Sequence, residues 1–286
     1  MKKLSILLVA FLFTAGMAFA QNNDATTTQD GNNNSAETTQ SGEALEANIE
    51  QVGNYNEATQ SQYGLFNILD INQSGNENVA TQTQDSRENG YDPDNQAYID
   101  QSGDENTAIQ TQEGQRSYAS IDQSGNYNEA TQSQSNQGLT ALIDQSGDDN
   151  EATQVQSNNG FRASIDQSGS YNEATQTQEG MRNVAEVDQS GYENSATQEQ
   201  FGSQSHPLQG FLRIDQSGDG NVGIQLQTSN EAGSSATLVQ SGNDNWSSQS
   251  QFGPGANTAS VIQLSDGNRA TQSQTGSGNT ATIHQD

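Results

Sequence analysis

Residues with small, apolar or amide side chains alternate with polar residues along most of this chain, with a period of two. In the segment A-S-I-D-Q-S-G at 119–125, Ala, Ile, Gln and Gly share one side, and Ser and Asp share the other. Such alternation is typical of a β-strand, because successive side chains of a strand point to opposite faces. The G-x-x-N segment that follows, as at 125–128, predicts a turn, since Gly and Asn tolerate positive φ.

The strand-and-turn pattern recurs at a nearly constant spacing, which one column of glutamines makes visible. The column occupies positions 29, 40, 51, 62, 73, 84, 101, 112, 123, 134, 145, 156, 167, 178, 189, 200, 216, 227, 240, 251, 263, 274 and 285. Eighteen of its 22 intervals are eleven residues long, and the other four are 17, 16, 13 and 12. A disordered glutamine-rich chain has no reason to keep this count, so the spacing indicates a repeat architecture.

Two kinds of eleven-residue unit alternate and together make a 22-residue repeat. The better-kept half follows I-x-Q-x-G-x-x-N-x-A, and the looser half runs from A-T-Q-x-Q into a variable turn. The four long intervals begin at Gln84, Gln200, Gln227 and Gln251, and all of them follow the looser half. Insertions are therefore expected at one edge of the structure, as in other repeat arrays.

These patterns predict an all-β fold, a two-sided β-solenoid or cross-β stack of about eleven 22-residue strand-turn-strand-turn repeats over residues 21–286. One repeat cannot bury its inner face alone, whereas stacked repeats can. At about 4.8 Å per rung, such a stack is roughly 55 Å long.

The predicted interior is unusual because glutamine shares it with Ile, Ala and Gly. Aligned amides can hydrogen-bond along a stack, and a buried amide without partners costs about 1–3 kcal/mol, which explains the strict spacing. The expected ladder residues are Gln51, Gln73, Gln101, Gln123, Gln145, Gln167, Gln189 and Gln216. The expected turn residues are Gly125, Asn128, Gly147, Asn150, Gly169 and Asn172. The expected core residues are Ile99, Ile121, Ile143 and Ile165.

The first twenty residues differ from the repeats. Lys2 and Lys3 precede an apolar run from 4 to 13, and small residues end the segment at Ala18-Phe19-Ala20. This pattern predicts a secretory signal peptide over residues 1–20, cleaved after Ala20. The apolar run is too short for a permanent transmembrane helix, so no membrane anchor is expected.

Charge and composition restrict the partners of the remaining chain. It keeps six arginines and all 36 acidic residues, so its formal net charge is 6 − 36 = −30. Such a chain is repelled by nucleic acid and by anionic membranes. With 29% hydrophobic residues and no cysteine, composition alone would indicate disorder, whereas the residue order indicates a repeat fold.

No constellation for catalysis or for a cofactor stands out. The only histidines, His206 and His284, have no second histidine at metal-ligand spacing. The many carboxylates form a solvated column rather than a pair in a pocket. We therefore expect no enzyme, no cofactor and no catalytic or metal residues, with weak calcium binding along the aspartate column left open.

The phrase x-I-x-Q-x-G-x-x-N-x-A-x-x-x-Q resembles the curlin repeat of bacterial curli subunits. Here it is carried by Ile71, Gln73, Gly75, Asn78, Ala80 and Gln84 and by the equivalent residues of later repeats. The resemblance implies a secreted, structural amyloid-fibre subunit for surface adhesion and biofilm matrix, located outside the cell. It also implies self-association as a head-to-tail homopolymer, a nucleator subunit and outer-membrane export machinery as partners.

This chain departs from the curlin pattern in several places. Glutamine replaces the isoleucine expected before the second glutamine at positions 60, 82, 132, 154 and 176. Ser265 stands where glycine is expected, and Gly223 and Ser247 stand where alanine is expected. The choice between a major subunit, a nucleator and a minor component stays open.

The two ends of the repeat region favour polymerisation. The pattern already holds at Ala25–Gln29, and the last strand, T-A-T-I-H-Q at 280–285, has no polar capping repeat after it. Monomeric solenoids protect such edges, whereas open complementary ends form filaments. The outward aspartate column at 100, 122, 144, 166, 188 and 215 brings like charges together, so we expect faster assembly in acid or with divalent cations. Simple solubility of an exposed face is the other interpretation of this column.

Two other structural roles remain as alternatives. Outward pairs such as Thr81 and Thr83, Thr131 and Ser133, and Thr175 and Thr177 resemble the threonine array of some ice-binding β-solenoids. The array is interrupted at Val155, Glu199 and Leu226. A monomeric β-solenoid adhesin is the second alternative. Tyr55, Tyr127, Tyr171 and Tyr192 beside the G-x-x-N turns are expected to pack along the edge, with carbohydrate contact as the other possibility.

Overall fold

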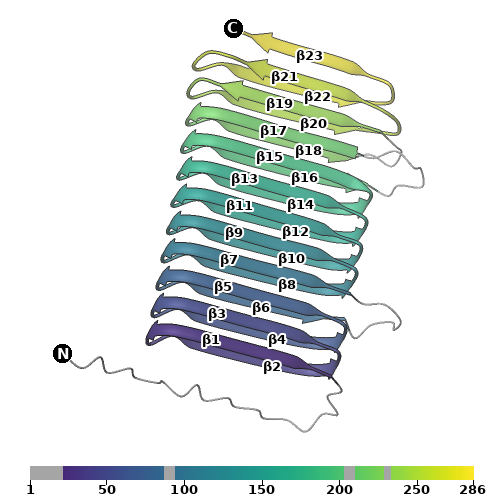
Figure 1. Ribbon diagram of the computed structural model, residues 1–286. Helices are drawn as coiled ribbons and strands as arrows, with labels where there is room; N and C mark the ends of the chain where they lie inside the picture. The colour runs from purple at the N-terminus through teal and green to yellow at the C-terminus, as the bar shows by residue number, and fades with distance from the viewer. Residues whose placement is uncertain (1–21, 87–93, 203–209, 229–232) are drawn as a thin grey trace, which may run out of the picture.

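The chain forms one stack of β-strands in two layers (Figure 1). The structure, a computed structural model, describes residues 22–86, 94–202, 210–228 and 233–286. The predicted signal peptide and His206 lie outside these residues. All 23 described strands lie in two parallel sheets, and the described residues contain no helix. The all-β solenoid prediction is therefore confirmed.

Each sheet takes every second strand of the chain. The twelve-stranded sheet contains β1 (Asp24–Asn32), β3 (Glu46–Asn54), β5 (Ile68–Asn76), β7 (Gln96–Asp104), β9 (Tyr118–Asn126), β11 (Thr140–Asp148), β13 (Arg162–Ser170), β15 (Asn183–Tyr192), β17 (Gly210–Asp219), β19 (Ser235–Ser241), β21 (Thr258–Gln263) and β23 (Thr280–Gln285). The eleven-stranded sheet contains β2 (Ser35–Glu43), β4 (Glu57–Leu65), β6 (Val79–Asp85), β8 (Thr107–Gln115), β10 (Glu129–Gln137), β12 (Glu151–Asn159), β14 (Glu173–Met181), β16 (Ser195–Gly202), β18 (Val222–Thr228), β20 (Trp246–Phe252) and β22 (Arg269–Thr275).

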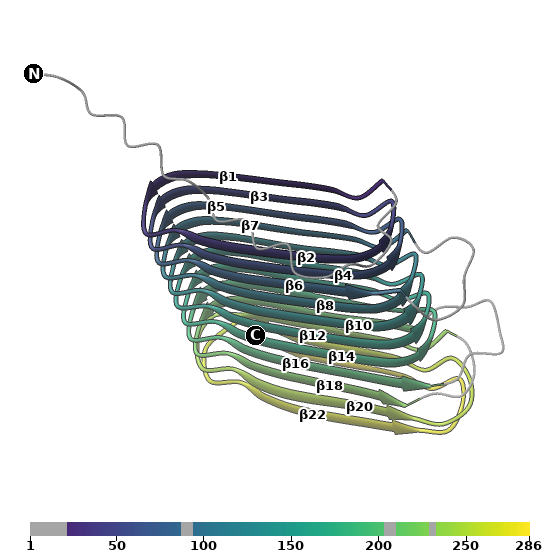
Figure 2. The same cartoon turned by 90° about the horizontal axis from the view of Figure 1, so that it is seen from below.

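Neighbouring strands pair in parallel with equivalent residues side by side. Ile121 of β9 lies beside Ile143 of β11, and Gln132 of β10 lies beside Gln154 of β12. Seen from one end of the stack, the two sheets face each other across a thin interior (Figure 2). Each column of like residues in the sequence is thus a straight row along the stack.

The four long intervals are all connections that leave the eleven-stranded sheet. They follow β6, β16, β18 and β20, and each leads to the next strand of the twelve-stranded sheet. The prediction that insertions collect at one edge agrees with this topology. Insertions at that edge leave the strand register unchanged, because pairing resumes with Gln101, Gln216, Gln240 and Gln263 in the glutamine row.

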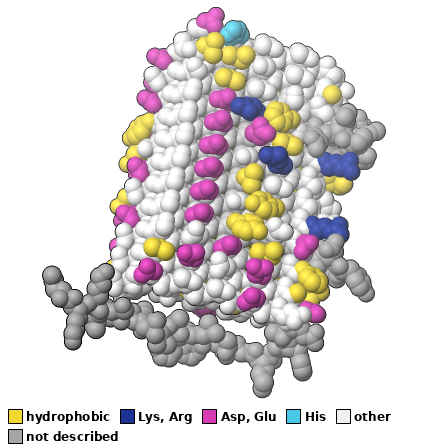
Figure 3. Space-filling view, viewed as in Figure 1, with side chains coloured by type: hydrophobic (Ala, Val, Ile, Leu, Met, Phe, Trp, Pro, Cys, Tyr) yellow, Lys and Arg dark blue, Asp and Glu magenta, His cyan; other side chains and the backbone are white. Residues whose placement is uncertain are grey.

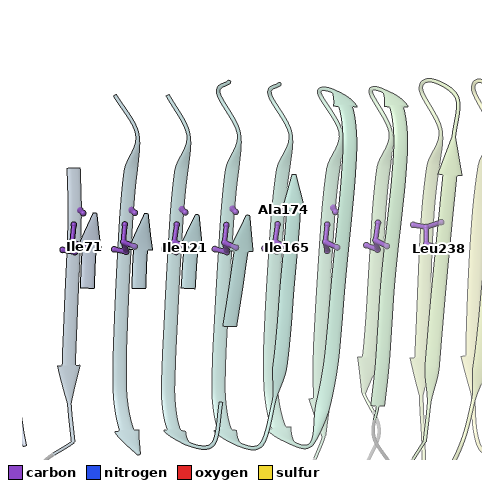
Figure 4. Close-up of a cluster of buried hydrophobic side chains, with 14 of the residues drawn as sticks. Ile71, Ile121, Ile165, Ala174 and Leu238 are labelled. Carbon is purple, nitrogen blue, oxygen red and sulfur yellow. The ribbon is translucent and has the colours of Figure 1, made fainter. Parts of the chain in front are cut away.

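The longest hydrocarbon cluster of the interior is one narrow row along the stack. Isoleucines of the twelve-stranded sheet pack against alanines of the eleven-stranded sheet, as Ile165 does beside Ala174 (Figure 4). The predicted core residues Ile99, Ile121, Ile143 and Ile165 lie in this row, and each is at most 2% exposed. A second inward column of the twelve-stranded sheet holds alanine or leucine, as at Leu69, Ala97 and Ala119, and glutamines fill the remaining inward columns of the two sheets.

The turn after each twelve-stranded-sheet strand differs from the sequence expectation in one respect. Gly125 has the expected positive φ of 106°, but the second positive φ, 59°, belongs to Tyr127 rather than to Asn128. The expectation of positive φ at the asparagine is therefore wrong. Asn128 has the same parity as Ala130 and Gln132, so its side chain points into the stack and is buried.

Candidate assembly site

The glutamine row of the twelve-stranded sheet forms a continuous hydrogen-bonded ladder. From Gln51 to Gln216, each Nε2 donates to Oε1 of the glutamine in the next rung at 2.8–2.9 Å. The residues in this part of the ladder are Gln51, Gln73, Gln101, Gln123, Gln145, Gln167, Gln189 and Gln216, all fully buried. The structure thus places all eight predicted ladder residues in one row.

The second N–H of these amides connects the two sheets. Gln123 Nε2 also donates to the carbonyl of Thr107 in β8 at 3.1 Å, and Gln145 Nε2 donates to the carbonyl of Glu129 in β10 at 3.1 Å. Both donors of each amide are therefore paired, one along the stack and one across it. Full pairing removes the cost of burying an amide, so a polar interior is compatible with a stable fold.

Two further glutamine ladders run along the eleven-stranded sheet. Gln132 donates to Gln154 at 3.0 Å and to the Ser120 carbonyl at 2.9 Å. Gln134 donates to Gln156 at 2.9 Å and to the Tyr118 carbonyl at 3.0 Å. Glutamine at this position, where the sequence resemblance predicts isoleucine, therefore adds a ladder instead of leaving a gap in the core.

Asparagines of the turns form a fourth row of amides. The positive φ of this turn belongs to Asp149 and not to Asn150. The Nδ2 and the backbone N–H of Asn150 both donate to Asn128 Oδ1 at 3.1 Å. Its Nδ2 also donates to the Gly169 carbonyl in the next rung at 3.0 Å. Asn172 repeats these bonds with Asn150 and Gly191. Sequence reasoning missed this ladder, although the inward parity of the asparagine would have indicated it.

The glycine of G-x-x-N is required because neighbouring rungs approach closely at this position. A Cβ on Gly125 would lie 2.0 Å from the Gly147 carbonyl oxygen, and one on Gly147 would lie 2.0 Å from that of Gly169. The same carbonyls accept the asparagine amides, as Gly147 O does from Asn128 at 2.8 Å. Glycine and asparagine of the motif therefore act together, one rung apart.

The aspartate column lies on the outer face of the twelve-stranded sheet (Figure 3). Asp122 pairs in register with Asp100 and Asp144, so each carboxylate has a like charge on both sides. Partial burial, followed by the charges of neighbouring aspartates, raises the pKa of Asp100, Asp144 and Asp188 above the ordinary value. The column therefore opposes stacking near neutral pH.

Tyrosines beside the turns and threonines on the outer face of the eleven-stranded sheet form less regular rows than the buried glutamines. The rings of Tyr171 and Tyr192 pack edge to face with centroids 5.2 Å apart, while both stay exposed. In the outward threonine rows, Ile109 and Val155 interrupt the array and are exposed. The rows thus lack a continuous flat threonine surface.

The two ends of the stack have strands with only one neighbour. β1 and β2 pair only with β3 and β4, and β22 and β23 pair only with β20 and β21. Thr258 N–H donates toward the next rung, to the Asn279 carbonyl at 2.8 Å. By the same alternation, the N–H groups of Thr280, Thr282 and His284 in β23 face the open side. Each end is an unpaired template for another parallel strand.

Other chemistry is sparse in the described part of the chain. No group of three or more His, Asp or Glu side chains there could hold a metal ion. His284 lies on β23 and contacts the Asp286 carboxylate at 3.1 Å. Among the described residues, no helix has the length and apolar character needed to cross a bilayer.

Comparison with known families agrees with this geometry. A family model described as the curlin associated repeat matches residues 162–191 and 256–286. The two matches support a curlin-type family, as the sequence resemblance predicted, and the first of them contains the central ladder and turn residues Gln167, Gly169 and Asn172. A search of curated proteins found no match to the chain.

Proposed function

We propose that this protein is a secreted structural subunit that polymerises head to tail into extracellular curli-type fibres, which serve surface adhesion and the biofilm matrix. The curlin repeat supports a curli-type fibre subunit in general. In the proposal, residues 1–20 are the signal peptide and residues 21–286 are the assembling repeat region. The solenoid and the family are structural, and no enzymatic role is proposed.

The observation that carries the proposal is that the glutamine ladder of the twelve-stranded sheet runs from Gln29 in the first rung to Gln285 in the last. At the last rung, Gln263 donates to Gln285 Oε1 at 2.8 Å. Among the described residues, Gln285 Nε2 donates only to the Arg269 carbonyl. At the first rung, Gln29 donates to Gln51, and no donor to Gln29 Oε1 is found among the described residues. A donor end and an acceptor end favour head-to-tail addition of copies.

The finer features of the proposal follow from the resemblance and from charge. A nucleator subunit and outer-membrane export machinery are the proposed partners, because curli-type subunits are expected to leave the cell before they assemble. The net charge of −28 for the full chain keeps separate copies apart before assembly. Nucleic acid is not a proposed partner, because it is also negatively charged and repels this chain.

The test blocks the open edge of β23. Thr282→Pro removes an N–H that faces the open side while leaving the pairing of β23 with β21 in place. The chain from Gln21 onward is diluted from denaturant, and fibres are followed by thioflavin T fluorescence and electron microscopy. We expect fibres from the unsubstituted chain, and a β-rich protein with little or no elongation from the proline variant.

Thr282→Val is the matched control, because it retains the N–H and a β-branched side chain at the same exposed position. It should assemble like the unsubstituted chain. A stable, monodisperse monomer of the unsubstituted chain would refute polymerisation, and so would undiminished fibre growth of the proline variant through this end.

A further inference from the structure

The two sheets of the stack differ by one strand. Twelve strands lie in one sheet and eleven in the other, so the described chain makes eleven and a half rungs. Because the chain alternates between the sheets, the position that follows β23 lies on β22, in the eleven-stranded sheet. A second copy that kept the orientation of the first would place its β1 on β23 and leave that position empty.

In the first rung, the strands of the two sheets have the same inward residues, unlike the strands of later rungs. In later rungs, the central inward residue is Ile, Val or Leu in the twelve-stranded sheet and Gln in the eleven-stranded sheet, as for Ile49 and Gln60. In β1 and β2, this residue is threonine in both, Thr27 and Thr38. Both strands thus present Ala, Thr and Gln inward, and each can occupy either sheet.

We propose that successive copies are related by a half-turn about the stack axis. β1 of the second copy then extends the eleven-stranded sheet past β22, and its β2 extends the twelve-stranded sheet past β23. A half-turn about this axis exchanges the sheets, reverses the strand direction as required, and keeps the N-to-C polarity of the stack. The inference rests on the proposed head-to-tail polymerisation and specifies its geometry.

The unpaired amides at the ends agree with this arrangement. Gln272, the last residue of its ladder, is 6% exposed, and its Nε2 is buried without an acceptor. In the rotated copy, the residue over Gln272 is Thr27, whose hydroxyl can accept this hydrogen bond. Within one copy, threonine at 38 leaves Gln60 Oε1 buried without a donor. The identity of Thr38 is thus not explained by stacking inside the molecule.

Thr38 of the second copy has a suitable neighbour in the rotated arrangement. It lies over Ile283, which packs against the end of the hydrophobic row and is only partly buried. The threonine methyl group can cover this side chain, as an alkyl group does in the interior rungs. Threonine therefore suits both positions, because the Thr27 hydroxyl meets the polar Gln272 and the Thr38 methyl group meets the apolar Ile283.

The glutamine ladders also continue. Gln274 and Gln285 each donate across the stack, to the carbonyls of Thr258 and Arg269, and each retains an N–H for the next rung. In the rotated copy these residues meet Gln29 and Gln40, whose Oε1 atoms have no donor among the described residues. Donors at one end thus meet acceptors at the other.

Turn residues match in the same way. Asn268 precedes β22 and Asn279 precedes β23, and they are the last residues of the two rows of turn side chains. The residues that lie over them in the rotated copy are Asn23, before β1, and Asn34, before β2. Both rows therefore continue from asparagine to asparagine, the pairing that the interior asparagine ladder uses.

Charges on the outer faces favour the same orientation. With the half-turn, Asp24 lies beside Arg269, the residue that stacks over Trp246 at 4.5 Å. Without it, Asp24 lies beside Thr280, and Asp30 lies beside Asp286. Opposite charges on adjacent strands attract and like charges repel, so the rotated copy gains an ion pair and avoids a repulsion.

Disulfide trapping distinguishes the two orientations, since the chain has no cysteine of its own. Thr26 is outward on β1; in the rotated copy it lies beside Thr271 of β22, and in the unrotated copy beside Thr282 of β23. The double variants Thr26→Cys/Thr271→Cys and Thr26→Cys/Thr282→Cys are assembled under reducing conditions and then oxidised. The fibres are dissolved in denaturant, and covalent oligomers are measured on a non-reducing gel.

We expect the Thr271 pair to give about tenfold more covalent dimer and higher oligomers than the Thr282 pair, because a disulfide needs Cα atoms within about 7 Å. The reverse preference, or fibres in which neither pair cross-links, would overturn the half-turn while leaving polymerisation intact. Failure of both variants and of the unsubstituted chain to form fibres would overturn the proposed function itself.

Discussion

Single residues in this stack have partners above, below and across. Gln145 illustrates the arrangement: it accepts from Gln123 at 2.8 Å, donates to Gln167 at 2.9 Å, and donates to the Glu129 carbonyl at 3.1 Å. Removal of one amide therefore leaves several groups unpaired inside the protein. The cost of a substitution depends on these orphaned groups more than on the lost side chain itself.

Gln145→Leu should lower the free energy of unfolding by about 2–5 kcal/mol, because an amide of Gln123, an oxygen of Gln167 and the Glu129 carbonyl lose partners. Guanidinium denaturation followed by circular dichroism measures the change. Gln137→Leu is the control, since this side chain is exposed at the end of β10; its effect should stay within about 0.5 kcal/mol. Equal stability of the two variants would contradict the ladder's role.

Gly147→Ala should prevent close stacking of two rungs, because the added Cβ would lie 2.0 Å from the Gly169 carbonyl oxygen. Gly138→Ala is the matched control: Gly138 also has positive φ, 69°, but no atom lies within 4 Å of an added Cβ. The control should cost roughly 1–2 kcal/mol for the left-handed backbone alone. Denaturation midpoints compare the pair, and a Gly147 variant as stable as the control would show that crowding is unimportant.

At the level of elements, the pairing of strands is predictable from the sequence, whereas the hydrogen bonds between the two sheets are not. The period of two and the eleven-residue spacing predicted two parallel sheets, because a fixed count brings equivalent residues side by side. The bond from Gln123 to the Thr107 carbonyl was not predictable, since it depends on the distance between the sheets. Turn propensity indicates a turn at Asn128 but does not report its buried contacts, which depend on the inward parity of its side chain.

The aspartate column makes the stability of the twelve-stranded sheet depend on pH. Since burial and neighbouring carboxylates raise the pKa of Asp100, Asp144 and Asp188 when folded, the folded state binds protons at higher pH than the unfolded state. Stability should therefore increase as pH falls from neutral through the raised pKa values toward the ordinary value of about 4. Below that value no further gain is expected from this column.

Assembly should accordingly be faster, and the denaturation midpoint higher, at about pH 4 than at about pH 8. Asp144→Asn should reduce this difference, because it removes a carboxylate flanked by Asp122 and Asp166. Glu179→Gln removes one charge at an exposed position whose register neighbours are Ser157 and Phe201, so it should leave the difference unchanged. Equal rates and midpoints at both pH values would argue against the column.

At the scale of the whole molecule, the protein is a segment of a ladder rather than a closed body. Rows of amide and of apolar side chains run along its axis, and strands at both ends have one neighbour only. The sequence predicts about eleven repeats, and each of the 23 glutamines in the column lies in one of the 23 strands that the described residues form. A molecule built in this way grows by adding copies along its own axis.

Fibre diffraction from aligned fibres of the chain from Gln21 onward tests this account most directly. If the solenoid axis is the fibre axis, the strand spacing of about 4.7–4.8 Å appears along the fibre, with the sheet spacing of about 10 Å across it. Unbranched fibres with this orientation are the predicted result. A strand spacing perpendicular to the fibre axis, or a β-rich monomer that remains soluble, would contradict the claim that each copy continues the ladder of the one before.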